Sequence, residues 1–377
     1  MRAIDFTSAS PGDLIALPAG VEAFVPHPLP RLLALEPDLV YLLDQASRSV
    51  ATLSGVGEAL LNPHLLIAPF TRREAVLSSR IEGTQASLTD VYVFEATGRG
   101  DRSDAREVAN YVRAMNVGLE TLEQLPVCVR LARELHGVLL EGVRGEDKRP
   151  GELRDRQVWI APPGTPIESA RFVPPPAERV ADLLTDWERF VNDDQPLPPL
   201  IRCALMHYQF ETIHPFNDGN GRVGRLLIPL LLIELKVLSS PLLYLSAYFD
   251  AHRPEYYDHL YRVSTTGEWH PWLRFFLEGI SEQSQDAIQR SRRIRALQET
   301  YRQRLHEDHA PASALRLCDE LFVRPVLRRS DVAAVLDMTV AGARNVLDRL
   351  VGAGILRSEA GTYPQLYVAH ELLEVLT

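Results

Sequence analysis

A turn rich in glycine and charged side chains runs directly into the apolar segment Leu226 to Ile233. From His214 to Arg225 the sequence reads HPFNDGNGRVGR. Gly219 and Gly221 can adopt positive φ at little cost, so consecutive N–H groups of this turn can point into one concavity that binds an anion. An apolar helix that begins near Arg222 adds its unpaired N–H groups and its positive dipole end to the same place. The pattern predicts an anion site at the mouth of a buried helix.

The charged side chains of this run favour a polyphosphate as the anion. Arg222 and Arg225 are three residues apart and share a helix face, where two guanidinium groups suit phosphate oxygens. The carboxylate of Asp218 cannot hold a magnesium ion alone, and it suits a site where substrate phosphates supply most of the other ligands. His214 can take a proton from an incoming hydroxyl, because the ordinary pKa of histidine is close to physiological pH.

Gly219, Gly221 and Gly224 also match the glycine spacing of a dinucleotide-binding turn. That fingerprint requires a preceding strand, a βαβ unit and an acidic residue about twenty positions later. The segment from Leu200 to Glu211 instead spaces its apolar residues as a helix does. We therefore reject a Rossmann fold.

The run from His214 resembles the signature of the Fic family, HPFx(D/E)GNGRxxR, and matches it at every specified position. The resemblance implies transfer of AMP from ATP to a Tyr, Thr or Ser hydroxyl of a target protein, with release of pyrophosphate. It implies that His214 activates the hydroxyl and that Asp218 holds Mg²⁺. Gly221 favours nucleotidyl transfer over phosphorylation, since relatives that act as kinases carry lysine there. The residues that the resemblance assigns to ATP are Gly219, Asn220, Gly221, Arg222, Val223, Gly224 and Arg225.

A second motif lies upstream of the first. Ser78, Glu82 and Gly83 satisfy the family's inhibitory signature, (S/T)xxxE(G/N). The resemblance implies that Glu82, at a helix end, pairs with Arg225 and keeps this arginine from holding the γ-phosphate. ATP could then bind with its α-phosphate poorly placed for in-line attack. The motif precedes the core, which resembles Fic proteins whose inhibitory helix lies before the catalytic domain.

Two further segments resemble parts of the family's active site. Residues Gln157 to Ala161 alternate as a strand does, a Pro/Gly turn follows, and residues 171–175 can form a short second strand. This predicts a β-hairpin flap that could hold a target as an added strand, with a hairpin that only covers the core as the alternative. Tyr256 and Tyr257 match a tyrosine pair that contacts the nucleotide in the family.

The C-terminal part is expected to be a winged helix-turn-helix domain. The pattern predicts a helix from Ser313 to Phe322, a short helix from Arg329 with Ser330 as its cap, and a helix from Val340 to Ala353, before two short strands around a polar loop. From residue 312 onward seven arginines face eight acidic residues. DNA binding, protein docking and dimerisation therefore all stay open for this domain.

The second of these C-terminal helices limits what a nucleic acid could contact. It offers only Arg344, Asn345 and Arg349 to bases or phosphates. A net charge of −10 argues further against a general nucleic-acid binder. DNA is therefore a weakly supported partner.

At 377 residues the chain is long enough for two or three domains. We expect a mainly α fold with a Fic-type helical core. The expected division is an N-terminal helical region with the inhibitory motif over 1–100, the catalytic core over 101–280, a linker helix over 281–310 and the winged helix-turn-helix domain over 311–377.

Composition points to the cytoplasm. Residues 1–11 do not resemble a signal segment, and the apolar stretch 226–233 is too short to cross a membrane. Cys128, Cys203 and Cys318 have no paired spacing, which is typical of a reducing compartment.

Two functional classes stay open. The first is a self-inhibited protein AMP-transferase, which could also modify itself and could form a homodimer. The second is a transcription regulator in which the core only senses nucleotide. Intact residues at His214 and Arg225 favour the enzyme. A third alternative is that Glu82 positions water to remove AMP from modified targets.

Overall fold

The structure is a computed structural model that describes residues 1–58, 64–98, 102–359 and 364–376. In these residues helices dominate, and the named strands lie in an N-terminal hairpin and a C-terminal unit. The expected mainly α class is confirmed. The boundary expected at residues 100 and 101 and most of the C-terminal polar loop fall outside the described residues.

The core of the molecule is built around α8 (Asn220–Glu234), the helix expected from the apolar segment. Nearly all its residues are buried, and a helix that is apolar on every side must be surrounded by others. It packs against α2, α4, α5 and α7. The core helices are α2 (His64–Ile81), α3 (Leu88–Thr97), α4 (Arg102–Thr121), α5 (Val129–Leu139), α6 (Val180–Asn192), α7 (Pro199–Ile213), α9 (Ser246–Ala251) and α10 (Arg253–Thr266).

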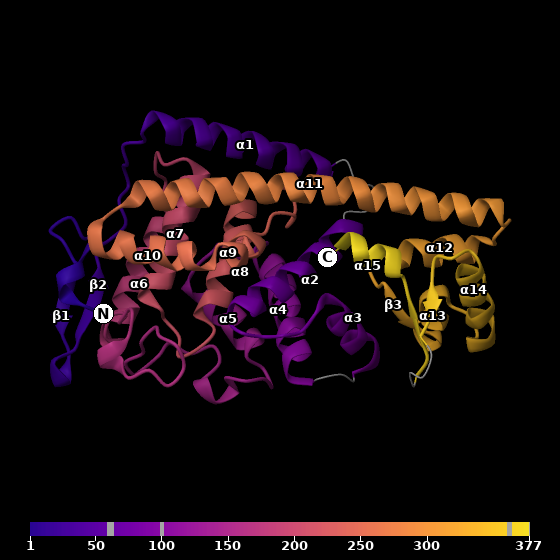
Figure 1. Cartoon of the computed structure of the whole chain (residues 1–377), viewed down its shortest axis with the longest axis horizontal. Coiled ribbons are helices and arrows are strands. Elements are labelled where there is room, and N and C mark those ends of the chain that lie inside the picture. The colour runs from indigo at the N-terminus through magenta and orange to yellow at the C-terminus, as the bar shows by residue number, and fades with distance from the viewer. Residues whose placement is uncertain (59–63, 99–101, 360–363, 377) are drawn as a thin grey trace.

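A long helix, α11 (Trp269–Glu307), runs across one side of the core, and α1 (Pro37–Glu58) lies along it (Figure 1). The apolar positions Leu39, Ala46, Val50 and Leu53 of α1 are buried, as expected for the inner stripe of an amphipathic helix. Because α11 begins at Trp269, the linker helix expected at 281–310 is the continuation of a helix that begins in the core. Among the described residues, no helix is both long enough and apolar enough to cross a bilayer.

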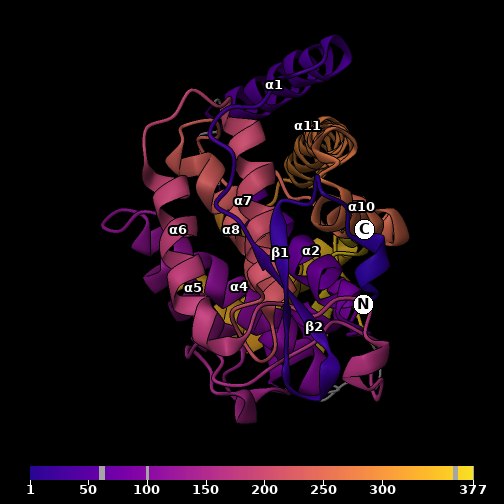
Figure 2. The same ribbon diagram turned by 90° about the vertical axis from the view of Figure 1, so that its left-hand side faces the viewer.

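The N-terminus forms an antiparallel hairpin that the sequence analysis did not predict. Strand β1 (Gly12–Ala16) pairs with β2 (Glu22–Pro26), with Leu14 opposite Phe24 (Figure 2). The signal was present as two short alternating segments around a turn with Pro18 and Gly20. The helical region expected over residues 1–100 begins only after this hairpin, with α1.

The expected flap hairpin is reduced to one bridge pair, Ile160 with Phe172. Ile160 N–H donates to the Phe172 oxygen at 2.8 Å, and Phe172 N–H donates to the Ile160 oxygen at 3.3 Å. The prediction of two regular strands was wrong because two prolines follow the first segment and two more lie at the end of the second, and proline supplies no ladder donor. We call residues 157–175 the flap.

The C-terminal unit contains helices and a small sheet in the order β3-β5-β4. The helix predicted from Arg329 is found as α13, but the cap predicted at Ser330 was wrong, because Ser330 lies inside the helix. The N-cap is Arg328, whose N–H donates to the Asp331 carboxylate at 2.8 Å. The unit packs on α11 through α12 and α15. Its elements are α12 (Ala312–Leu321), β3 (Val326–Arg328), α13 (Arg329–Leu336), α14 (Val340–Gly352), β4 (Arg357–Ser358), β5 (Leu366–Val368) and α15 (His370–Leu376).

Candidate active site

His214 lies at the C-terminal end of α7, with a left-handed φ of 51°. Its ring Nδ1 lies 3.2 Å from the Glu211 carbonyl oxygen. Because an oxygen can only accept here, Nδ1 carries the proton and Nε2 is the basic nitrogen. Burial, with the charge of Arg154 nearby, lowers the pKa of His214 to about 4. The histidine is therefore neutral at pH 7 and able to accept a proton.

Arg154 holds the backbone around His214, and the sequence analysis missed it. This arginine is 2% exposed, and its Nε donates to the His214 oxygen at 2.8 Å. Its Nη2 donates to the oxygens of Ile213 and Pro175. Burial lowers the pKa of Arg154 to about 10, so the group stays charged at neutral pH. An arginine just before the flap was a visible signal, but sequence does not show that it reaches the carbonyl groups of Ile213, His214 and Pro175.

Asn220 clamps the loop after His214. Its Nδ2 donates to the Phe216 oxygen at 2.9 Å, and its Oδ1 accepts the Phe216 N–H at 2.8 Å. Asn220 is 2% exposed. The structure therefore shows this side chain fixing the loop, with both ends of the amide engaged.

His136 on α5 contacts the other side of the same loop, and it was not among the predicted site residues. Its Nδ1 accepts the Gly151 N–H at 2.8 Å, so its Nε2 carries the proton. Nε2 donates to the backbone carbonyl oxygen of Asp218 at 2.9 Å. The ring stacks on Phe216 with centroids 3.9 Å apart. Burial lowers the pKa of His136 to about 4, which keeps the ring neutral. Nothing in its local sequence distinguishes it from a core histidine.

The turn after Asp218 leads into the first turn of α8. Gly219 has a φ of 78° and is the N-cap, a conformation that suits glycine. The Asp218 carboxylate is 39% exposed and its Oδ1 accepts the Gly219 N–H at 2.6 Å. The first N–H groups of α8, which have no partner within the helix, and a partly exposed carboxylate therefore lie in adjacent positions.

Arg222 is a buried guanidinium with two carboxylates at the long end of ion-pair distance. It is 1% exposed, and its nearest acidic oxygens lie 3.5 Å away on Glu107 and 3.6 Å away on Asp218. Its Nε has no hydrogen-bond partner among the described residues. Buried polar groups are nearly always satisfied, so this site fits an anion as the missing acceptor.

Arg225 is fully engaged by the C-terminal turn of α2. Its Nη2 donates to Glu82 Oε1 at 2.7 Å, and its Nε donates to Ser78 Oγ at 2.8 Å. Arg225 Nη2 also donates to the Ser78 carbonyl oxygen at 3.0 Å. Two of the three residues of the upstream motif thus contact the second arginine of the downstream motif, while Gly83 has a φ of 97° just past the helix end.

The Glu82 carboxylate lies over the glycine turn. A Cβ added to Gly221 would come within 2.4 Å of Glu82 Oε1. Burial opposes ionisation of Glu82, but the charge and hydrogen bond of Arg225, together with the charge of Arg222, outweigh it, and the pKa of Glu82 falls below its ordinary value. The carboxylate is therefore an internal anion in the position where the sequence analysis expected a bound phosphate.

Four other predicted site residues are buried to different extents around this centre. Tyr256 is 1% exposed, and its hydroxyl donates to His207 Nε2 at 2.8 Å within the core, whereas Tyr257 is partly buried. Val223 is fully buried, and a Cβ on Gly224 would collide with Glu211. These positions pack the base of the site.

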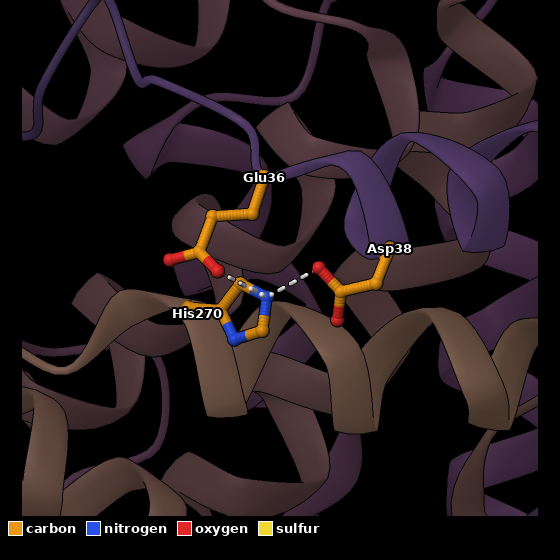
Figure 3. Close-up of side chains that lie close together, drawn as sticks. All are labelled: Glu36, Asp38 and His270. Carbon is orange, nitrogen blue, oxygen red and sulfur yellow. Dashed lines mark hydrogen bonds and ion pairs between the residues drawn. The ribbon is translucent and has the colours of Figure 1, made fainter.

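In the described part of the chain, one group of histidine and carboxylate side chains is close enough to share a metal ion (Figure 3). His270 Nε2 lies 3.1 Å from Asp38 Oδ1 and 3.9 Å from Glu36 Oε2. Asp38 also accepts from Arg274 at 3.1 Å. These are surface ion pairs that hold the start of α1 against the start of α11, away from His214.

Comparison with known proteins agrees with this geometry. A sequence model described as the Fic/DOC family N-terminal region matches residues 40–120, and one described as the Fic/DOC family matches residues 126–232. A Fic family protein from Desulfovibrio desulfuricans has a similar structure, with a TM-score of 0.59 at 21% identity, over 89% of this chain and 97% of that one. The fold is that of Fic proteins, and the chain belongs to the Fic/DOC family.

Named relatives share lower identity over part of the chain. The protein adenylyltransferase fic-1 of Caenorhabditis briggsae is 27% identical over 56% of this chain and 39% of its own length. The protein adenylyltransferase Fic of Drosophila mojavensis is 27% identical over 64% of this chain and 47% of its own length. The chain thus spans less than half the length of these relatives.

Proposed function

We propose that this protein transfers AMP from ATP to a Tyr, Thr or Ser hydroxyl of a target protein and releases pyrophosphate. The observation that carries the proposal is a neutral histidine, His214, beside a glycine turn and two buried arginines, Arg222 and Arg225. The names of the relatives from Caenorhabditis briggsae and Drosophila mojavensis give the same activity for those proteins.

The reaction follows from the residues that surround the turn. His214 Nε2 takes the proton of the acceptor hydroxyl while the oxygen of that hydroxyl bonds to the α-phosphorus of ATP. The bond between the α-phosphorus and the bridging oxygen breaks, and pyrophosphate leaves with the electron pair. Arg222, the start of α8 and a freed Arg225 stabilise the negative charge of the phosphates.

Asp218 is the residue that would hold Mg²⁺. Its carboxylate is partly exposed next to the turn, and a single acidic ligand suits an ion whose other ligands are phosphate oxygens and water. The ion would neutralise phosphate charge, and the protein's part is to present one oxygen of Asp218.

Inhibition by Glu82 accounts for the pairing seen in the structure. The Glu82 carboxylate takes the hydrogen bond of Arg225 and lies against Gly221, so it competes with a phosphate for both. Removing one partner of a buried ion pair strongly destabilises a protein unless another charge takes its place. The γ-phosphate of ATP would take the place of Glu82 beside Arg225. We therefore propose that the end of α2 must move before ATP can bind productively.

For the C-terminal unit we propose a winged helix that contacts protein rather than DNA. The order of α12, β3, α13, α14 and the β4–β5 pair supports the winged-helix assignment. On α14, Arg344 lies 3.6 Å from Asp348, and Arg349 lies 2.8 Å from Asp308. Both arginines expected to meet DNA are thus already beside carboxylates.

Three unpaired buried cysteines support a reducing compartment such as the cytoplasm.

The test compares ATP labelled at the α-phosphate with ATP labelled at the γ-phosphate, using the Glu82→Gly protein and Mg²⁺. Label from the α-phosphate should stay on protein, either on the enzyme itself or on an acceptor protein from a cell extract. Label from the γ-phosphate on protein would instead mean a kinase and would contradict the proposal. The same chain with Glu82→Gly and His214→Ala is the matched control, and it should carry neither label.

A further inference from the structure

A small hydrophobic cluster, separate from the main core, joins the N-terminal hairpin to the flap. Its fully buried members are Ala23 on β2 and Ala170 and Val173 in the flap. The partly buried side chains around them come from the same two segments: Met1, Ile15, Leu17 and Val21 from the N-terminus, and Ala161 and Ile167 from the flap. The hairpin and the flap therefore share a packed interior of their own.

A backbone hydrogen bond joins the flap to β2. Phe24 N–H on β2 donates to the Val173 oxygen at 3.0 Å, and the adjacent residue Phe172 forms the bridge with Ile160. Successive residues of an extended chain present their hydrogen-bonding groups to opposite sides. Residues 172 and 173 thus make backbone hydrogen bonds to Ile160 on one side and to β2 on the other.

Phe24 is the side chain at the centre of this contact. It is fully buried, and its ring lies 5.8 Å from that of Phe172 and 5.5 Å from that of Phe6. A Cβ on Gly12 would lie 2.6 Å from the same ring, so the hairpin closes tightly around it. Aromatic contacts at these separations stabilise more than their buried area alone.

The flap has little internal pairing to define its position. Its two halves share one bridge pair, and even a regular two-stranded hairpin is marginally stable in water by itself. The flap is nevertheless tied to the site, because Arg154 donates to both the Pro175 oxygen and the His214 oxygen. The N-terminal hairpin is thus a further support for the flap, beside Arg154 and the ion pair between Arg171 and Asp258 of α10.

We propose that the N-terminal hairpin positions the flap, with Phe24 as the main positioning residue, and so determines how an acceptor hydroxyl is presented to His214. This inference rests on the proposed AMP transfer. Residues 1–36 lie outside the two segments matched by the family sequence models.

The first test measures amide hydrogen exchange in the full chain and needs no activity. Phe24→Ala should speed exchange of the Ile160 and Phe172 amides at least about tenfold, because their support loosens, while α8 amides are unchanged. Ile4→Ala is the matched control, since Ile4 lies in the same N-terminal segment and is 87% exposed. Unchanged exchange at Ile160 and Phe172 would overturn the proposal. If Phe24→Ala also loosens α8, Phe6→Ala, which removes the ring next to Phe24, is read by the same two criteria.

The second test separates acceptor positioning from nucleotide binding. In the Glu82→Gly protein, Phe24→Ala should lower self-modification at saturating Mg²⁺–ATP about tenfold and leave the KM for ATP unchanged, and Phe24→Leu should restore most of the rate. An equal rate, or a loss seen only in the KM for ATP, would overturn the positioning role. If the Glu82→Gly protein transfers no AMP, the proposed function fails, and the exchange experiment still decides whether the hairpin holds the flap.

Discussion

At the scale of single residues, the properties of His214 follow from its place at the end of α7. Its Nδ1 is fixed by the Glu211 oxygen, which leaves Nε2 as the base. His214→Ala should abolish AMP transfer by the Glu82→Gly protein and leave ATP binding largely intact, because the imidazole is not a phosphate ligand. Isothermal titration with ATP and a transfer assay on the same protein measure both. Full transfer activity in the alanine variant would contradict the mechanism.

The pH dependence of transfer should report the same histidine. Burial lowers the pKa of His214 to about 4, so the neutral, basic form persists as the pH falls from 8 to 5. Single-turnover transfer by the Glu82→Gly protein should therefore stay nearly constant over that range and fall as the pH approaches 4. A rate that halves near pH 6.5, the ordinary pKa of histidine, would contradict the environment described for His214.

Glu211 offers a second test at this scale. Its Oε1 is buried without a hydrogen-bond partner among the described residues, and burial raises its pKa to about 7, partly offset by Arg225. The unfolded chain loses this proton near the ordinary pKa of glutamate and the folded protein near 7. The wild type should therefore lose stability as pH rises between these values, by about 1–3 kcal/mol.

Glu211→Gln removes that proton equilibrium and keeps the shape of the side chain. The variant should be more stable than the wild type at pH 8, and the two should converge below pH 4.5 in denaturant unfolding. A constant difference at both pH values would contradict the raised pKa.

At the scale of elements, the inhibitory helix α2 is held at its end by more than Glu82. Arg253 at the start of α10 donates to the Ile81 oxygen, the last residue of α2. Arg253→Ala should loosen this turn and raise AMP transfer of the otherwise unchanged protein about fivefold, as expected for the loss of one hydrogen bond of about 1 kcal/mol. Arg48→Ala on the exposed face of α1 is the control. No increase in transfer would show that the helix end is held without Arg253.

Sequence predicted the elements whose signals are local. The glycine turn and the apolar segment predicted α8, and the helical spacing of 200–211 predicted α7, because these patterns need only neighbouring residues. The flap was predicted as a regular hairpin, but its conformation depends on β2, which lies far away in the sequence. His136 and Arg154 were missed for the same reason, since their roles consist of contacts with distant backbone groups.

At the scale of the whole molecule, the C-terminal unit is attached along α11. Arg290 on α11 donates to the Val375 and Leu376 oxygens, and Arg304 pairs with Glu371 of α15 at 3.1 Å. A conformational change in the C-terminal unit can thus be transmitted to α11, the helix that α1 also packs against.

The charges of the C-terminal unit predict weak binding to DNA. With Arg344 and Arg349 beside carboxylates, mixed-sequence duplex DNA should bind no more tightly than the ordinary non-specific range of about 10⁻⁴–10⁻⁶ M at physiological salt. Fluorescence anisotropy with a labelled duplex measures this. Binding in the nanomolar range would contradict a protein-docking role.

The central claim is that Glu82 restrains an otherwise complete AMP-transferase, and intact-protein mass spectrometry tests it most directly. Wild type, Glu82→Gly and Glu82→Gly with His214→Ala are each incubated with Mg²⁺ and ATP. We expect the mass of an AMP group to appear on Glu82→Gly alone, because removing the carboxylate frees Arg225 and Gly221 for phosphate. Equal modification of the wild type and Glu82→Gly would contradict the restraint, and modification that survives His214→Ala would contradict the catalytic role of the histidine.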